Sequence, residues 1–286
     1  MKRFISILMA AMIMLTVTSC GSADETASGS NKTASSAVDN KDTAEQGVLK
    51  PYVENEEKKV NILLLGDSLT QGTFGSSGYR SYLCDMLLDD GYKFNFVGPW
   101  QIEPAFMRAG YRNHAGVGGY RMSGIKNDMN TFMSFDCDII VMMIGTNDMN
   151  SGSAEELTKQ YSELVDMITK AKPNVRLFCA SAPPTSFSSG SYTEKHVAFN
   201  KGVKGVCESK TKQGFKVTWL DMSPDNSGVM PSDINPEDHV HPVNSGWEKF
   251  AKTIHKTIKG AMDEVSAEKG VKYYKPYKKY ANYRLL

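Results

Sequence analysis

Short apolar runs and longer amphipathic segments alternate along most of the chain. The apolar runs are rich in β-branched and aromatic residues and end in polar or glycine-containing turns, which predicts strands at 59–65, 93–97, 138–144, 175–181 and 215–220. Apolar positions at helical spacing predict helices at 79–90, 123–135, 154–172, 193–212 and 246–265. Strands that are apolar nearly end to end are typical of parallel sheets with helices on both faces. We therefore expect a doubly wound, flavodoxin-like α/β sandwich with a central, mostly parallel five-stranded sheet.

Two of the expected helices carry a marked start. Ser153 with Glu156, and Ser245 with Glu248, fit the capping box, in which the serine hydroxyl accepts from a backbone N–H three residues on and the glutamate reaches back. Both helices are therefore predicted to begin directly after these serines.

The N-terminus departs from this pattern. Lys2 and Arg3 precede about 15 apolar residues, fewer than the roughly 20 needed to cross a bilayer, and the stretch ends at Val17-Thr18-Ser19-Cys20. This ending resembles a bacterial lipobox, which implies cleavage of a signal peptide (1–20) before Cys20, lipidation of Cys20, and an exported, extracellular lipoprotein anchored at the bacterial cell surface. The alternative is an ordinary signal peptide that happens to end in Cys.

Composition divides the remaining chain. Residues 21–50 are small and polar, so we expect a flexible tether, whereas we expect 51–270 to form one folded domain and 271–286 a basic, aromatic tail. The 286 residues carry a formal charge of +1, and loss of Lys2 and Arg3 leaves 31 basic against 32 acidic residues, so nucleic acid is not an expected partner. These features predict no particular oligomeric state.

The spacing of cysteines and acidic residues predicts neither a metal site nor a cofactor. Four cysteines lie in apolar or helical contexts without a CxxC or Cys/His pattern and are expected to be buried side chains: Cys84, Cys137, Cys179 and Cys207. Four aspartates form no Ca²⁺ loop by their spacing: Asp136, Asp138, Asp148 and Asp221.

Polar clusters follow the expected strands at three places. Gly66-Asp67-Ser68 follows the first strand, Gly145-Thr146-Asn147-Asp148 follows the third, and Asp238-His239-Val240-His241 precedes the last helix. A serine hydroxyl becomes a nucleophile when an imidazole takes its proton and a carboxylate orients the imidazole. The three-residue spacing lets Asp238 reach one ring nitrogen of His241 and leaves the other for Ser68, with His239 at the rim.

Each cluster also has a purely structural interpretation. Ser68 can cap a helix, Asn147 and Asp148 can close a turn, and Asp238 with His241 can form a solvated loop. Because ligands of doubly wound sheets collect at the carboxyl ends of the strands, the joint placement of the three clusters favours a catalytic triad.

Four motifs in order resemble the conserved blocks of the SGNH or GDSL-type hydrolases: "LLLGDSLTQG", "GVGGYR", "IGTND" and "DHVHP". The resemblance covers roughly residues 59–258. It implies Ser68 as nucleophile, with Asp238 and His241 as the acid-base pair. It also implies an oxyanion hole made by the N–H groups of Ser68 and Gly119 (chosen over Gly116 and Gly118) and the Asn147 amide.

Further local likeness points to the substrate. "GYRSYLCDMLLDDGYKFNFVG", "NHAGVGGYRM" and "IGTNDM" resemble the acetylxylan esterase branch of the superfamily, which implies a carbohydrate esterase that removes O-acetyl groups from xylan or a related saccharide. One departure is Val117-Gly118, where related sequences tend to carry Ser before the oxyanion glycine. Aromatic and basic residues near the expected site suit contact with sugar rings: Tyr79, Trp100, Tyr111, Tyr120 and Arg121.

Three other interpretations remain open. A lysophospholipase or acyl-thioesterase of the same fold would need a wide apolar groove. A flavodoxin-like anion-binding module would use the loop after the first strand. A non-catalytic, polysaccharide-binding lipoprotein would rely on the tyrosine- and lysine-rich tail, which can equally well pack across the domain.

Overall fold

The computed structural model describes residues 58–73, 75–185 and 193–271. All of them belong to the second of two compact units of the chain, Val53–Leu286. The expected signal peptide and lipidation site, the tether, and the tail beyond residue 271 lie outside the described residues. Within the described part, none of the helices is both long and apolar enough to span a membrane.

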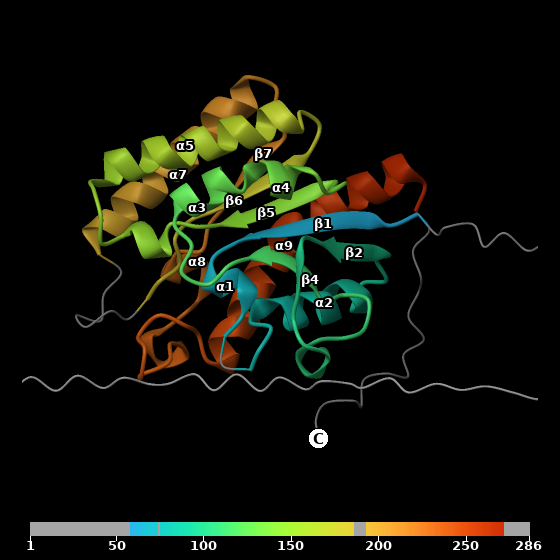
Figure 1. Ribbon diagram of the computed structural model, residues 1–286, viewed down its shortest axis with the longest axis horizontal. Helices are drawn as coiled ribbons and strands as arrows, with labels where there is room; N and C mark the ends of the chain where they lie inside the picture. Colours follow the sequence, from blue (N-terminus) through green and yellow to red (C-terminus); the bar gives the residue numbers. More distant parts are fainter. Residues whose placement is uncertain (1–57, 74, 186–192, 272–286) are drawn as a thin grey trace, which may run out of the picture. The chain divides into compact units, whose positions relative to one another are not determined.

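A seven-stranded sheet forms the centre of the described part (Figure 1). The five predicted strands are all present and parallel: β1 (Val60–Gly66), β2 (Phe94–Val97), β5 (Ile139–Met143), β6 (Arg176–Ala180) and β7 (Val217–Leu220). Their spatial order is β2-β1-β5-β6-β7, which is the flavodoxin-like order. The predicted doubly wound fold class is thus confirmed.

Two short strands were not predicted from the sequence, so the sheet has seven strands instead of five. β3 (Trp100–Gln101) pairs antiparallel with β4 (Asn113–Gly116), and β4 runs parallel to the last two residues of β1. β3 has two residues, and the sequence of β4, Asn-His-Ala-Gly, contains no β-branched or large aliphatic side chain. Neither strand therefore produces a hydrophobic pattern.

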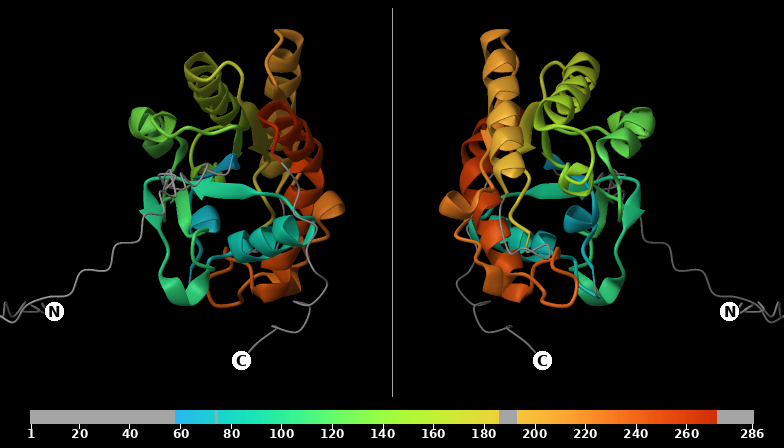
Figure 2. Two further views of the ribbon diagram at one scale, coloured as in Figure 1. Left: turned by 90° about the vertical axis from the view of Figure 1, so that its right-hand side faces the viewer. Right: turned by 90° about the vertical axis from the view of Figure 1, so that its left-hand side faces the viewer.

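Helices cover both faces of the sheet (Figures 1 and 2). One face packs against α2 (Tyr79–Asp89) and α9 (Asn244–Lys269). The other packs against α3 (Met122–Asn127), α4 (Met129–Met133), α5 (Ala154–Ala171) and α7 (Glu194–Lys212). Along β1, Ile62 and Leu64 enter the first layer whereas Leu63 and Leu65 enter the second, and all four are fully buried. The central strand is therefore enclosed on both sides, as its apolar sequence indicates.

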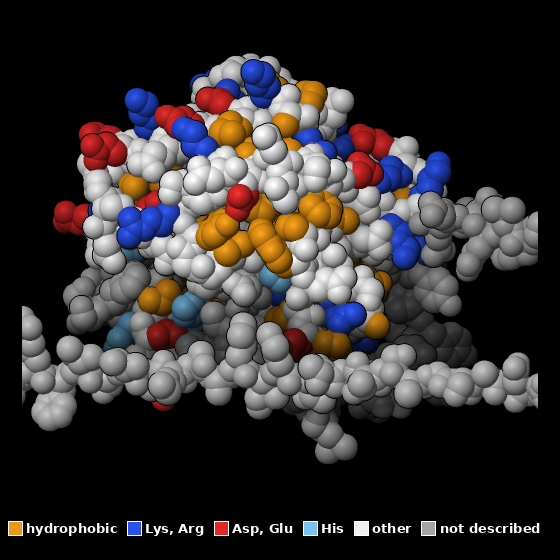
Figure 3. All heavy atoms as spheres, viewed as in Figure 1, with side chains coloured by type: hydrophobic (Ala, Val, Ile, Leu, Met, Phe, Trp, Pro, Cys, Tyr) orange, Lys and Arg blue, Asp and Glu red, His pale blue; other side chains and the backbone are white. Residues whose placement is uncertain are grey.

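Short helical segments connect these elements: α1 (Ser68–Gln71), η1 (Pro104–Phe106), η2 (Thr146–Asp148), α8 (Pro224–Ser227) and η3 (Pro231–Asp233). The four cysteines of the domain are buried, as predicted, and form no disulfide bond with one another. On the face shown in Figure 3, charged side chains gather mainly around the upper helices, and apolar side chains form a group near the centre.

One predicted capping box is confirmed and the other is wrong. The Glu156 N–H donates to the Ser153 Oγ at 3.2 Å, and the Ser153 N–H donates to a Glu156 carboxylate oxygen at 2.7 Å. In contrast, α9 begins at Asn244, and the Ser245 Oγ donates to the buried Asp233 carboxylate at 2.6 Å. Ser245 lies two residues beyond Val243, which occupies the cap position, and a buried carboxylate is a strong alternative acceptor.

The helix predicted over 123–135 is also divided. Asp128, with φ −96° and ψ 10°, separates α3 from α4, and its carboxylate accepts the Tyr120 hydroxyl. The apolar pattern continues across this break because both short helices bury the same face, so periodicity alone indicates one helix.

Candidate active site

The end of β1 presents Ser68 at the carboxyl edge of the sheet. Asp67 is the N-cap of α1, and its Oδ1 accepts from the Leu69 N–H at 2.9 Å. Ser68 is the first residue of the helix, so the interpretation of Ser68 as the cap is wrong. Its hydroxyl is left for another partner.

That partner is His241, which lies 173 residues further along the chain. The Ser68 Oγ and the His241 Nε2 are 2.7 Å apart, and the His241 Nδ1 is 3.0 Å from the Asp238 Oδ2. Because a carboxylate only accepts, the hydrogen bonds indicate that Nδ1 carries the proton and that Nε2 accepts from the Ser68 hydroxyl. The three residues predicted as a triad thus form one hydrogen-bonded row.

A tight turn holds the carboxylate and the imidazole together. The Asp238 Oδ1 accepts from the N–H groups of Val240 and His241 at 2.8 and 2.9 Å. Between them His239 is exposed and has φ 62°, a left-handed conformation that helps to close the turn. The Asn235 N–H donates to the His241 carbonyl oxygen at 2.8 Å, which ties the two ends of the loop. His239 lies outside the row, as the sequence predicts.

The same contacts control the charge of the carboxylate. Burial on its own would raise the pKa of Asp238, but the N–H groups of Val240 and His241 and the imidazole of His241 outweigh it, so that the pKa is lowered. Asp238 therefore stays ionised in mildly acidic solution and can stabilise a positive charge on the imidazole.

A turn at Val117–Tyr120, here called the glycine turn, lies beside α1. β4 ends at Gly116, where an added Cβ would lie only 2.4 Å from the Gln71 nitrogen, so glycine is needed for this close approach. The Gly118 N–H donates to the Gln71 side-chain oxygen. Within the described residues, the N–H of Gly119 donates to no other group. Of the two glycines, Gly119 therefore has the available N–H donor, and its role in an oxyanion hole stays a prediction.

Asn147 lies in η2, directly after β5, and packs against this glycine turn. Its Nδ2 donates to the Tyr120 carbonyl oxygen at 2.8 Å. An amide nitrogen carries two hydrogens, so this bond uses one and leaves a second donor. The neighbouring Asp148 carboxylate accepts from the Met122 N–H at 3.2 Å, at the start of α3. Asn147 and Asp148, both in the third motif, therefore hold the end of the glycine turn where the chain enters α3.

Two buried charged groups beneath the site were missed from the sequence. Asp67 is fully buried, and burial, with a smaller contribution from Asp148, raises its pKa to about 7. Arg80 is also fully buried and donates to the carbonyl oxygens of Thr70 and Gln71, each at 2.8 Å. Burial lowers the pKa of Arg80 to about 10, so the guanidinium remains charged. The burial of Arg80 could have been predicted from the sequence, because this residue shares a helical face with the buried Leu83 and Leu87.

The aromatic and basic residues that the sequence suggested for sugar contact differ in burial and in position. Tyr79 is fully buried, with its hydroxyl 3.3 Å from the Thr70 Oγ1, so a substrate role is excluded. Tyr111 packs on the Phe94 ring in the core layer of α2, at 4.9 Å between centroids. Tyr120 and Arg121 directly follow Gly119, and Arg121 is exposed. These last two remain near the candidate site.

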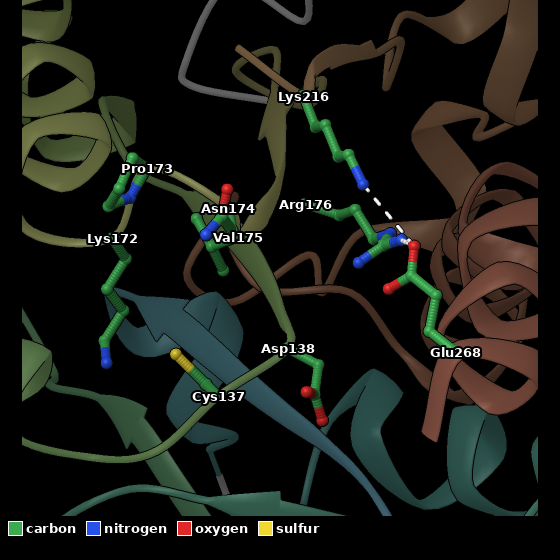
Figure 4. A pocket seen from close by; sticks show the side chains of 9 residues that line it. All are labelled: Cys137, Asp138, Lys172, Pro173, Asn174, Val175, Arg176, Lys216 and Glu268. Carbon is green, nitrogen blue, oxygen red and sulfur yellow. Dashed lines mark hydrogen bonds and ion pairs between the residues drawn. The ribbon is translucent and has the colours of Figure 1, made fainter. Parts of the chain in front are cut away.

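A charged hollow of about 460 Å³ lies at the opposite edge of the sheet, where β5 and β6 begin (Figure 4). Arg176 and Lys216 converge on Glu268, and Lys269 binds Asp138 at 2.7 Å. The hollow lies at the starts of the strands, whereas Ser68 follows the carboxyl end of β1, so the two are at opposite edges of the sheet. The charged side chains of the hollow are also engaged in these ion pairs. In the described ranges, moreover, no cluster of three or more His, Cys, Asp or Glu side chains is suited to hold a metal ion.

Comparison with known proteins shows the class to which the chain belongs, which is that of the ester hydrolases. Residues 64–261 match the model of the GDSL-like Lipase/Acylhydrolase family, and the chain belongs to that family. The resemblance found in the motifs is thereby confirmed.

Three relatives define the similarity further. A multidomain esterase of Ruminococcus flavefaciens is 27% identical over 236 residues, which cover 74% of this chain but 30% of that protein. A carbohydrate esterase family 3 structure from Talaromyces cellulolyticus aligns with a TM-score of 0.63 at 24% identity, covering 72% of this chain and 100% of that one. The family 3 carbohydrate esterase of Clostridium thermocellum aligns at 0.62 with 26% identity, covering 73% and 99%.

Proposed function

We propose that this protein removes O-acetyl groups from carbohydrate through an acyl-enzyme formed on Ser68. The observation that carries the proposal is the hydrogen-bonded row from Ser68 through His241 to Asp238, with contacts of 2.7 and 3.0 Å. An anion-binding module would have no use for an imidazole aimed at the serine hydroxyl, so this row favours the enzyme over that alternative.

The chemistry proceeds in two halves. In the first, the Ser68 Oγ bonds to the acetyl carbonyl carbon while its proton passes to the His241 Nε2. The carbonyl oxygen becomes an oxyanion, which accepts from the N–H groups of Ser68 and Gly119 and from the Asn147 amide. When the carbonyl re-forms, the bond to the sugar oxygen breaks, and that oxygen takes the proton from His241. The sugar leaves with a free hydroxyl and the acetyl group stays on Ser68.

In the second half, water replaces the sugar. His241 takes a proton from the water as its oxygen bonds to the acetyl carbon, and the same three donors hold the oxyanion. Collapse then breaks the bond to the Ser68 Oγ, which recovers its proton from His241, and acetate leaves. Asp238 stays ionised throughout and stabilises the imidazolium that forms in each half.

The choice of an acetylated saccharide as substrate is supported by similarity over nearly the whole length of the Clostridium thermocellum carbohydrate esterase, at 26% identity. The motifs around Gly119 and Asn147 resemble acetylxylan esterases, so acetylated xylan is the substrate we propose to test first. Exposed Arg121, next to the glycine turn, suits hydrogen bonding to sugar hydroxyls.

Acyl-chain preference tests this proposal against a lysophospholipase or thioesterase. With 4-nitrophenyl esters, kcat/KM should fall steeply from acetyl to butyryl to octanoyl, because a site for O-acetyl groups needs room for one methyl group only. Acetate released from acetylated xylan should be measured in parallel, with Ser68→Ala as the blank. Equal or rising activity toward the octanoyl ester would assign the protein to long-chain acyl substrates instead.

We further propose that Cys20 carries a lipid that tethers the domain to the membrane, since the N-terminal motif resembles a lipobox. Two acyl chains are generally enough for stable anchoring. Cys20→Ser should move the protein from the membrane fraction to the soluble fraction and abolish incorporation of a labelled fatty acid, whereas Cys84→Ser should change neither. Membrane retention of Cys20→Ser without lipid label would indicate an uncleaved signal anchor.

A further inference from the structure

The donor at Gly119 sits in a four-residue turn with a defined geometry. The Tyr120 N–H donates to the Val117 carbonyl oxygen at 3.1 Å, which closes the turn. Gly119, the third residue, has φ 75°, whereas the φ of Gly118 is not positive. These values correspond to a type II β-turn, in which the third residue has φ near +80° and is usually glycine.

The turn type decides where the Gly119 N–H points. This N–H belongs to the central peptide, between Gly118 and Gly119, and that peptide is turned over between a type I and a type II turn. Glycine takes positive and negative φ about equally well. With glycine at both central positions, backbone sterics therefore do not select the type II form.

Gln71 holds this turn against α1. Its side-chain Oε1 accepts from the Gly118 N–H at 2.5 Å, which fixes the position of the peptide that precedes the central one. Gln71 is also the last residue of α1, the short helix that begins with Ser68. One rigid turn of helix thus carries both the nucleophile and the acceptor that holds the glycine turn.

The backbone of Gln71 is itself anchored. The fully buried guanidinium of Arg80 donates to the Gln71 carbonyl oxygen through Nη2 and to the Thr70 carbonyl oxygen through Nε. A charged donor makes stronger hydrogen bonds than a neutral one. The exposed Gln71 side chain therefore extends from a fixed base toward Gly118.

We propose that Gln71 is a positioning residue that holds the Val117–Tyr120 turn against α1 and thereby keeps the Gly119 N–H aimed at the oxyanion. The inference rests on the proposed function, because it assigns the orientation of one donor in that mechanism. Gln71 acts through the turn, by its contact with the Gly118 N–H.

Removal of the acceptor should slow the chemistry without weakening substrate binding. For Gln71→Ala, kcat on 4-nitrophenyl acetate should fall about tenfold, less than the roughly 10²- to 10³-fold cost of deleting a donor outright, because the turn still visits the right form. KM should stay within about twofold. Labelling of Ser68 by an organophosphate, which uses the same oxyanion donors, should slow by a similar factor. Gln213→Ala, at an exposed glutamine after α7, is the matched control and should leave all three measurements unchanged.

A rescue variant tests whether Gln71 acts by stabilising the Val117–Tyr120 turn or only supports the fold in general. Pro at the second position and Gly at the third favour a type II turn, and proline has no N–H that needs the Gln71 acceptor. In Gln71→Ala/Gly118→Pro, the shortened side chain also removes the contact at 3.0 Å that a Cβ at position 118 would make with the Gln71 oxygen. The double variant should recover most of the lost kcat and labelling rate.

The inference is overturned if Gln71→Ala keeps wild-type kcat, if it changes KM alone, or if the double variant folds but recovers nothing. A double variant that fails to fold, as judged by its melting curve, leaves the decision to the single variant, whose loss of kcat at constant KM supports the inference. A failure of the proposed function looks different, because acetyl esterase activity would then be absent from the wild type or would persist in Ser68→Ala.

Discussion

Ser68→Ala should lower kcat/KM for 4-nitrophenyl acetate by about 10⁴-fold or more, since members of a catalytic triad act as a unit and the nucleophile has no substitute. The melting temperature should barely change, because Asp67 and not Ser68 caps α1. Ser134→Ala, at an exposed serine after α4, is the matched control and should retain full activity.

The same experiment has a covalent readout. A serine-directed organophosphate should label the wild type on the peptide that contains Ser68, because the His241 Nε2, at 2.7 Å, accepts the serine proton. Ser68→Ala should not be labelled. Labelling of a different serine, or residual activity of Ser68→Ala close to the wild type, would show that the nucleophile has been assigned wrongly.

His241→Ala should be nearly as damaging as Ser68→Ala, because His241 transfers the proton in both halves of the reaction. Asp238→Asn should also be costly, by about 10⁴-fold, because the asparagine Nδ2 that replaces Oδ2 donates to the His241 Nδ1 and so favours the tautomer whose Nε2 cannot accept the serine proton. Asparagine keeps an oxygen for the bonds from the Val240 and His241 N–H groups, so this variant removes the charge while the turn is retained.

The pH dependence of kcat/KM gives a second test of His241 as the general base. Wild-type kcat/KM should fall as the pH is lowered, because a protonated imidazole cannot accept the serine proton. The lowered pKa of Asp238 keeps its carboxylate ionised across this range, so the acidic limb reports the imidazole.

His239 is the matched control within the same turn. His239→Asn preserves the tolerance for φ 62° and should leave both the rate and the acidic limb in place. If His239→Asn abolished activity while His241→Ala retained it, the general base would be one residue after Asp238 instead of three.

The sequence predicts the long strands and most of the row formed by Ser68, His241 and Asp238, because these features depend largely on local pattern. β1, for example, is apolar from Ile62 to Leu65, and the polar residues that follow it must lie at the carboxyl edge once the strand is placed in a parallel sheet. Asp238 and His241 are close along the chain, so their contact follows from spacing alone. Only the meeting of His241 with Ser68 needs the fold.

The features missed from the sequence depend on contacts between distant residues. The Gln71 side chain meets Gly118 across 47 positions, and nothing in either segment by itself indicates the pairing. Ser245 fits a capping pattern but instead donates to Asp233, which lies 12 residues earlier. Tyr79 looked suited to a sugar because aromatic side chains serve binding and packing equally, and the sequence does not record which one is buried.

Ser68 and His241 are 173 residues apart in the sequence, and this separation has a consequence for the chain while it is being synthesised. Ser68 and α1 are synthesised early, whereas His241 arrives only with the segment just ahead of α9. The last helix, α9, packs against α2 and β1, which are synthesised first. A nascent or C-terminally shortened chain that stops before His241 therefore lacks the proposed general base of Ser68. Under the proposed mechanism, hydrolysis begins only when synthesis of the domain is nearly complete.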